Sequence, residues 1–70
     1  MNLTTGDLRI GMTFRSTYDD SRFIYYKRCP SRKFLFKCIA PSEGSSYDLG
    51  EDTGLSIHAI NKHYELEKWD

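Results

Sequence analysis

The stretch RFIYYKRCPSRKFLFKCIA, residues 22–40, decides the fold of this chain of 70 residues. Two runs rich in aromatic and β-branched residues flank a short polar segment that begins with Pro30, and this pattern predicts a β-hairpin. With residues 30–33 as the loop, the expected register sets Cys29 opposite Phe34, Lys27 opposite Phe36, and Tyr25 opposite Cys38.

Side chains alternate between the two faces of a strand, so this register sorts the hairpin into two faces. The first face is apolar apart from Lys27 and is interpreted as a wall of the core: it carries Phe23, Tyr25, Cys29, Phe34, Phe36 and Cys38. The second face is basic, yet too apolar for an ordinary solvent-exposed surface: it carries Arg22, Ile24, Tyr26, Arg28, Leu35, Lys37 and Ile39. We therefore expect the function to reside on the second face.

A strand and a turn are predicted before the hairpin. LRIGMTFRS, residues 8–16, alternates apolar and polar side chains with a period of two, which predicts a half-buried strand. Gly11 within it indicates a bulge or a tight bend. Residues 17–21, TYDDS, have the composition of a turn. The inward side of the predicted strand carries Leu8, Ile10, Met12 and Phe14.

The segment after the hairpin is harder to assign. Residues 41–44 are predicted to form a loop, and a short strand follows in which Tyr47 and Leu49 face inward. Residues 50–54 are then expected to form an acidic turn.

The spacing of the apolar residues changes twice in the last part of the chain. Ser56 is predicted to cap a helix of one to two turns that begins at Ile57 and ends near residue 61 or 62. Residues 63–69 alternate again, which predicts a final strand with Tyr64 and Leu66 facing the core. The alternative is one continuous helix over residues 57–69, because most of its residues favour helix.

These elements predict one small all-β domain over residues 1–70, with about five strands and one short helical turn before the last strand. An antiparallel sheet with a C-terminal helix is the α+β alternative. A hydrophobic content of 39% with 14% aromatic residues argues against disorder. No apolar run is long enough to span a bilayer, and the first residues lack the pattern of a signal peptide, so a cytoplasmic protein with no membrane partner is expected.

The formal net charge is zero, but the charges are unevenly distributed along the chain. Residues 21–40 hold six basic and no acidic side chains, whereas residues 41–70 hold two basic and seven acidic ones. The acidic part either folds back to neutralise the hairpin or leaves it open to an anionic ligand. Pairing between chains is equally compatible with these charges, so a monomer or a homodimer is expected.

The cysteines and histidines predict neither a disulfide nor a metal site. In the expected register Cys29 and Cys38 are offset by about four residues, roughly 13 Å along a strand, so two reduced, buried thiols are expected. The spacing of Cys29 and Cys38 does not fit a zinc site, and His58 and His63 diverge on a helix. No motif for a nucleophile or for phosphate binding is present, so no catalysis and no cofactor are expected.

Two short segments resemble known small barrels. DLRIGMTF, residues 7–14, resembles the opening strand of small barrels in translation factors of the elongation factor P kind, and LSIHAINKHYEL, residues 55–66, is similar to the ending of many small phage-encoded barrels. The resemblance implies a barrel of the Src-homology (SH3-like) type and a small accessory or host-directed factor. It does not imply binding of proline-rich peptides, because the acidic-loop and aromatic-groove signatures are absent.

Two kinds of partner fit the basic face of the hairpin. Cations with an interleaved aromatic ring are typical of surfaces that bind RNA or single-stranded DNA. The predicted nucleic-acid-binding residues are Arg22, Tyr26, Arg28, Arg32, Lys33 and Lys37. The alternative is a host or partner protein, because apolar groups among charges are also typical of protein interfaces. The residues predicted to bind such a protein are Ile24, Leu35, Ile39 and Trp69.

Overall fold

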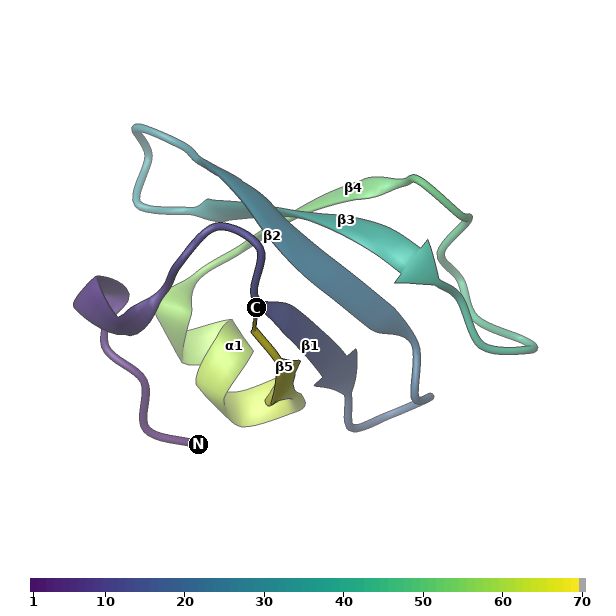
Figure 1. The fold of residues 1–70 in the computed structure, drawn as a ribbon. Coiled ribbons are helices and arrows are strands. Elements are labelled where there is room, and N and C mark those ends of the chain that lie inside the picture. The colour runs from purple at the N-terminus through teal and green to yellow at the C-terminus, as the bar shows by residue number, and fades with distance from the viewer. Residues whose placement is uncertain (70) are drawn as a thin grey trace.

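The computed structural model describes residues 1–69 and contains one antiparallel sheet of five strands, in the order β4-β3-β2-β1-β5. One short helix precedes the last strand, so this part of the predicted fold class is confirmed (Figure 1). The elements are the 3-10 helix η1 (Thr5–Asp7), β1 (Thr13–Ser16), β2 (Arg22–Arg28), β3 (Phe34–Ala40), β4 (Asp52–Leu55), α1 (Ile57–His63) and β5 (Tyr64–Lys68).

The core is mainly aromatic and lies against one face of the sheet, here called the core face. Phe14 and Phe36 meet edge to face with ring centroids 5.4 Å apart, and both are fully buried. Such pairs add about 0.5–1.5 kcal/mol to the gain from area burial. The buried apolar set is Leu8, Met12, Phe14, Phe23, Tyr25, Phe34, Phe36, Cys38, Ile60 and Tyr64.

The predicted hairpin strands are present, but the predicted register is wrong. Arg28 lies opposite Phe34 and Tyr25 lies opposite Phe36. The expected pairs are absent for two reasons: the loop contains residues 30–32 and not the predicted 30–33, and the register shifts again between Tyr25 and Lys27, where Tyr26 is an extra residue without a partner across the ladder. One extra residue in a strand is a β-bulge, and it exchanges the faces of all residues beyond it.

Because of the bulge, two side chains lie on different faces of the sheet from those predicted. Lys27 lies opposite Leu35 and is exposed, so it belongs to the opposite, outer face of the sheet and not to the core wall. Arg28 lies opposite the buried Phe34, so it belongs to the rim of the core face and not to the outer face. Cys29 is only half-buried, whereas Cys38 is fully buried; both thiols are free, as expected.

The predicted first strand is shorter than expected. Only Thr13–Ser16 form β1, because Gly11 has φ of +101° and the chain bends there, as the glycine indicated. The amide of Gly11 donates to the carbonyl of Tyr25 at 2.9 Å, which keeps the bend attached to β2. Leu8 and Met12 are buried as predicted, but Ile10 is 66% exposed, since the bend interrupts the alternation.

The N-terminal segment is fastened to α1 by one side chain. The amide group of Asn61 donates to the carbonyl of Leu3 and accepts from the Leu3 amide, both at 2.8 Å. A carboxylate oxygen of Asp7 accepts from the Thr4 amide at 2.8 Å, which lowers the pKa of Asp7 and stabilises η1.

The fourth strand lies later than predicted. Asp52–Leu55 pair with β3, so the expected acidic turn at residues 50–54 is wrong in part. The expected strand with Tyr47 and Leu49 is wrong: Leu49 is 73% exposed, and Tyr47 reaches the core from a loop, with its ring centroid 5.0 Å from that of Phe23. Pairing with β3 outweighs the poor strand propensity of Asp52 and Gly54.

The change from helix to strand at the C-terminus is confirmed. The Ser56 hydroxyl accepts from the Ala59 amide at 3.1 Å, and α1 then extends to His63, one or two residues beyond the predicted end. β5 pairs with β1, so the alternative of one continuous helix is wrong. Tyr64 is buried as predicted, but Leu66 is 40% exposed because β5 is an edge strand. Within residues 1–69, no helix is long and apolar enough to cross a membrane.

Candidate nucleic-acid interface

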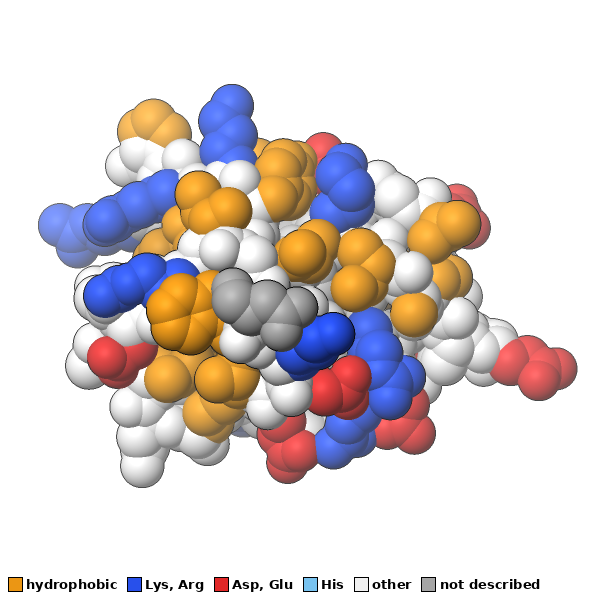
Figure 2. All heavy atoms as spheres, viewed as in Figure 1, with side chains coloured by type: hydrophobic (Ala, Val, Ile, Leu, Met, Phe, Trp, Pro, Cys, Tyr) orange, Lys and Arg blue, Asp and Glu red, His pale blue; other side chains and the backbone are white. Residues whose placement is uncertain are grey.

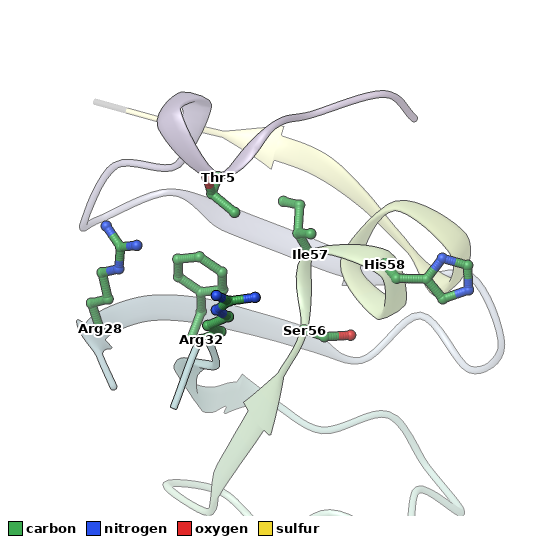
Figure 3. A pocket seen from close by; sticks show the side chains of 7 residues that line it. Thr5, Arg28, Arg32, Ser56, Ile57 and His58 are labelled. Carbon is green, nitrogen blue, oxygen red and sulfur yellow. The ribbon is translucent and has the colours of Figure 1, made fainter. Parts of the chain in front are cut away.

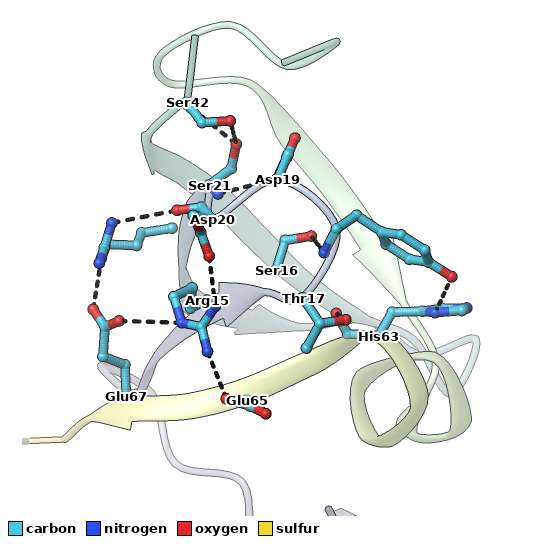
Figure 4. Close-up of polar contacts among 12 residues, drawn as sticks. Arg15, Ser16, Thr17, Asp19, Asp20, Ser21, Ser42, His63, Glu65 and Glu67 are labelled. Carbon is cyan, nitrogen blue, oxygen red and sulfur yellow. Dashed lines mark hydrogen bonds and ion pairs between the residues drawn. The ribbon is translucent and has the colours of Figure 1, made fainter. Parts of the chain in front are cut away.

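Part of the basic face is neutralised by the acidic C-terminal strand. Arg22 Nε lies 2.7 Å from a carboxylate oxygen of Glu67, and Arg15 contacts Asp20 at 2.6 Å and Glu65 at 2.7 Å (Figure 4). The hydrogen bond to Asp20 raises the pKa of Arg15. The predicted phosphate contact of Arg22 therefore competes with an ion pair within the protein.

Lys37 is paired in the same way on the other side of the hairpin. Its ammonium group lies 2.8 Å from Asp52 Oδ1 and 4.9 Å from the centroid of the Tyr26 ring. The hydrogen bond to Lys37 lowers the pKa of Asp52, and the hydrogen bond to Asp52 raises the pKa of Tyr26. The ring predicted to stack on bases therefore has a cation over it and a carboxylate beside it.

The turn between β2 and β3 has a backbone geometry that its sequence does not favour. The Cys29 amide donates to the Lys33 carbonyl at 2.9 Å and closes a loop of three residues, 30–32. Such loops usually end with a residue in the left-handed region, where glycine is preferred. Here that residue is Arg32, with φ of 63°. Asp20 has φ of 62°, but aspartate enters this region far more readily than arginine.

Four cations surround this turn and are here called the tip cluster: Lys27, Arg28, Arg32 and Lys33. All four are exposed, and no Asp or Glu among residues 1–69 forms an ion pair with any of them. Lys and Arg side chains gather at the upper left of Figure 2, where Figure 1 places the β2–β3 turn. Of the predicted nucleic-acid-binding set, Arg28, Arg32 and Lys33 thus lie together away from the paired Arg22 and Lys37.

The two arginines of the tip cluster also border a hollow of about 470 Å³. The Arg28 guanidinium carbon lies 5.7 Å from the centroid of the Phe34 ring, on the rim of the core face. In Figure 3 the side chains of Arg28, Arg32 and Thr5 lie around this hollow, whereas the His58 ring points away from it. The residues that line it are Thr5, Arg28, Arg32, Phe34, Ser56, Ile57 and His58.

The apolar residues predicted to bind a protein do not form one continuous set. Ile24 and Leu35 are half-buried on the outer face, and Ile39 is 42% exposed near the end of β3. Trp69 is 53% exposed and lies next to Gly11, with its Cδ1 4.0 Å from the position of a Cβ at that glycine. Trp69 therefore lies beside the bend before β1.

A second polar cluster lies between the β1–β2 turn and the end of α1. The Tyr18 hydroxyl is 2.7 Å from Nδ1 of His63, and both border a hollow of about 350 Å³. In the described part of the chain, no hydrogen bond joins the His63 ring to a serine, a cysteine or a carboxylate. Within residues 1–69, no three His, Cys, Asp or Glu side chains come together as ligands for a metal ion.

Several residues at or near the tip cluster could not be placed from the sequence pattern. The sequence predicts Lys27 on the core wall, because the bulge at Tyr26 leaves no mark in the sequence pattern. Thr5 in η1 and Ile57 in α1 both border the hollow, and no local pattern in the sequence signals that these two elements share it.

No protein-family model, no curated protein and no solved structure matches this chain.

Proposed function

We propose that this protein is a non-enzymatic binding module that holds RNA or single-stranded DNA through the tip cluster. The observation that carries the proposal is the contrast between paired and unpaired cations on one hairpin. Arg22 and Lys37 each have a carboxylate within 3 Å, whereas the four tip cations have no such partner among the described residues. Unpaired, exposed cations bind phosphates without first breaking an ion pair.

Binding at the tip rests on phosphates more than on bases. Tyr26 is covered by Lys37, and Phe34 is 1% exposed, so neither ring offers a free face to a base. Phosphate contacts carry no sequence information of their own. We therefore expect weak discrimination between sequences and a clear dependence on salt.

The same proposal includes the finer features of the fold and its location. We propose that the five-stranded sheet is a barrel of the SH3-like type, because α1 follows β4 directly, leads directly into β5 and contacts both edge strands. We also propose that the protein acts in the cytoplasm and is a small accessory factor, as the resemblance to phage-encoded barrels implies.

Fluorescence anisotropy with labelled single-stranded oligonucleotides tests the proposal between 50 and 200 mM salt. The test variant is Lys27→Gln with Lys33→Gln, and the matched control is Arg22→Gln with Lys37→Gln. Each removes two positive charges from the same hairpin. For single strands the slope of log K against log salt changes by about 0.7 per phosphate contact, so the test variant is expected to flatten it by about 1.4. The proposal is wrong if the control flattens the slope as much.

The second candidate function is the binding of a partner protein, and one observation favours it. No element among residues 1–69 fully covers Ile24 and Leu35, which remain half-buried between charged groups on the outer face. Leu35→Asp is then the damaging substitution, and binding changes little with salt, because apolar contacts are screened far less than ion pairs. A nuclease-resistant protein partner that is lost with Leu35→Asp supports this candidate against the first.

A further inference from the structure

We infer that the hollow beside the tip cluster binds a phosphate monoester on a nucleotide, either a free mononucleotide or the terminal phosphate of a strand. The inference rests on the proposed function and specifies which phosphate the tip prefers. Its basis is a built pocket that joins three parts of the chain: η1, the β2–β3 turn and the start of α1.

The rim of the pocket carries two positive charges. Arg28 and Arg32 both border it, and neither has a carboxylate partner among the described residues. A guanidinium group donates two parallel hydrogen bonds to a phosphate, and two such groups match the two charges of a monoester better than the single charge of a diester.

The walls of the pocket combine apolar and polar side chains. Ile57 is half-buried and supplies apolar surface, whereas Phe34 is almost fully buried and borders the hollow beneath the Arg28 guanidinium; Thr5 lies on the opposite side of the hollow from Arg32 (Figure 3). The Ser56 hydroxyl is already engaged as the cap of α1. A volume of about 470 Å³ lies within the range of sites for small ligands. A charged group at the rim above an apolar wall suits a phosphate attached to a sugar and a base.

The backbone of Arg32, at the rim of the pocket, is strained. An arginine at φ of 63° occupies a position where glycine is less strained. This conformation closes the turn through the hydrogen bond between Cys29 and Lys33, which glycine would allow equally well, while the Arg32 side chain makes no hydrogen bond or ion pair among the described residues. Unfavourable backbone conformations cluster at functional sites, and the guanidinium group of Arg32 at the pocket rim is the group that would have a function here.

A comparison of ligands tests the inference by ¹⁵N–¹H NMR titration of the full chain. The probes are adenosine 5′-monophosphate, adenosine, inorganic phosphate, and one oligonucleotide with either a 5′-phosphate or a 5′-hydroxyl. We expect the monophosphate to shift the amides of Phe34 and Ile57, adenosine to leave them unchanged, and the phosphorylated strand to bind more tightly than its hydroxyl form. Inorganic phosphate is expected to bind more weakly than the monophosphate, because it makes no contact with the apolar wall.

Two variants separate the pocket from the general charge of the tip. Arg32→Gly keeps the turn and removes one guanidinium, and it is expected to weaken the binding of the monophosphate about tenfold or more. Lys33→Gln removes the neighbouring charge, but Lys33 lies on the outer face, with its Cδ 3.6 Å from the position of a Cβ at Gly54, and it does not line the pocket. The Lys33→Gln variant is expected to bind both forms of the oligonucleotide more weakly by the same factor and to retain the preference for the 5′-phosphate.

The outcomes distinguish the pocket from the proposed function. Strand binding without a preference for the 5′-phosphate overturns the pocket and leaves the proposed function standing. Monophosphate binding without strand binding supports the pocket and overturns strand binding. Equal loss of the preference in Arg32→Gly and Lys33→Gln shows that charge density alone acts, which overturns the pocket. Absence of binding by all probes overturns both.

Discussion

Replacing Arg32 with glycine is expected to stabilise the fold while it weakens ligand binding. Arginine at φ of 63° carries a conformational cost of about 1–2 kcal/mol that glycine avoids. Glycine also lowers the free energy of unfolding by about 0.4–1 kcal/mol, because the unfolded chain gains conformational freedom. The side chain of Arg32 is exposed and makes no ion pair among the described residues, so little else is lost. The net gain in the free energy of unfolding is about 0.5 kcal/mol.

Thermal unfolding followed by circular dichroism measures this gain. For a domain of this size about 1 kcal/mol moves Tm by 4–8 °C, so Arg32→Gly is expected to raise Tm by about 2–4 °C. Lys33→Gly is the matched control: its φ is not positive, so it is expected to lower Tm. A fall in Tm with Arg32→Gly comparable to that of the control refutes the claim that the turn is strained, and strain at Arg32 then no longer supports the pocket.

Three further predictions concern the core, pH and the β4 edge. Phe36→Ala is expected to cost about 3–5 kcal/mol, because Phe36 is fully buried at the centre of the aromatic core, and near-ultraviolet circular dichroism is then expected to show a largely unfolded chain. Burial raises the pKa of Tyr64 to about 12. Between pH 10 and 12 the unfolded chain therefore binds fewer protons than the folded one, and the free energy of unfolding is expected to fall by about 2 kcal/mol. Chemical denaturation at the two pH values measures this fall, which is expected to be smaller in Tyr64→Phe. Gly54→Ala is expected to stabilise the fold by about 0.5 kcal/mol in urea titration, since its Cβ meets Lys33 at an ordinary 3.6 Å, whereas Gly50→Ala, at φ of +83°, is expected to destabilise it.

The features of the fold that follow from local patterns were predictable from the sequence. The hairpin strands, the cap at Ser56 and the return to a strand after α1 each depend on a short run of residues and its period. The bulge at Tyr26 was not predictable, because a bulge satisfies the same apolar alternation with one residue more. That single residue moved Lys27 and Arg28 to opposite faces and changed which cations share a surface.

The candidate site was predictable only as a collection of charges. The sequence shows six cations in residues 21–40, but it does not show which carboxylates reach them. Glu67 reaches Arg22 because β5 returns beside β1, and Asp52 reaches Lys37 because β4 pairs with β3. These contacts between distant segments leave the tip as the unpaired part of the hairpin.

One wall of the pocket belongs to the N-terminal segment, which is attached to α1 through Leu3 and Asn61 and can open independently of the sheet. Residues 1–7 contribute Thr5 to the hollow and are held by the two hydrogen bonds of Asn61, by contacts of Met1 with Asn61 and Leu66, and by the packing of Leu3 against the core; all their side chains except that of Leu3 are exposed. Local opening of this segment therefore requires far less free energy than global unfolding, and its amides exchange with solvent on their own timescale. A ligand that needs the closed wall opposes this opening by mass action. Hydrogen exchange at Leu3, which does not line the pocket, thus reports on whether the pocket is filled.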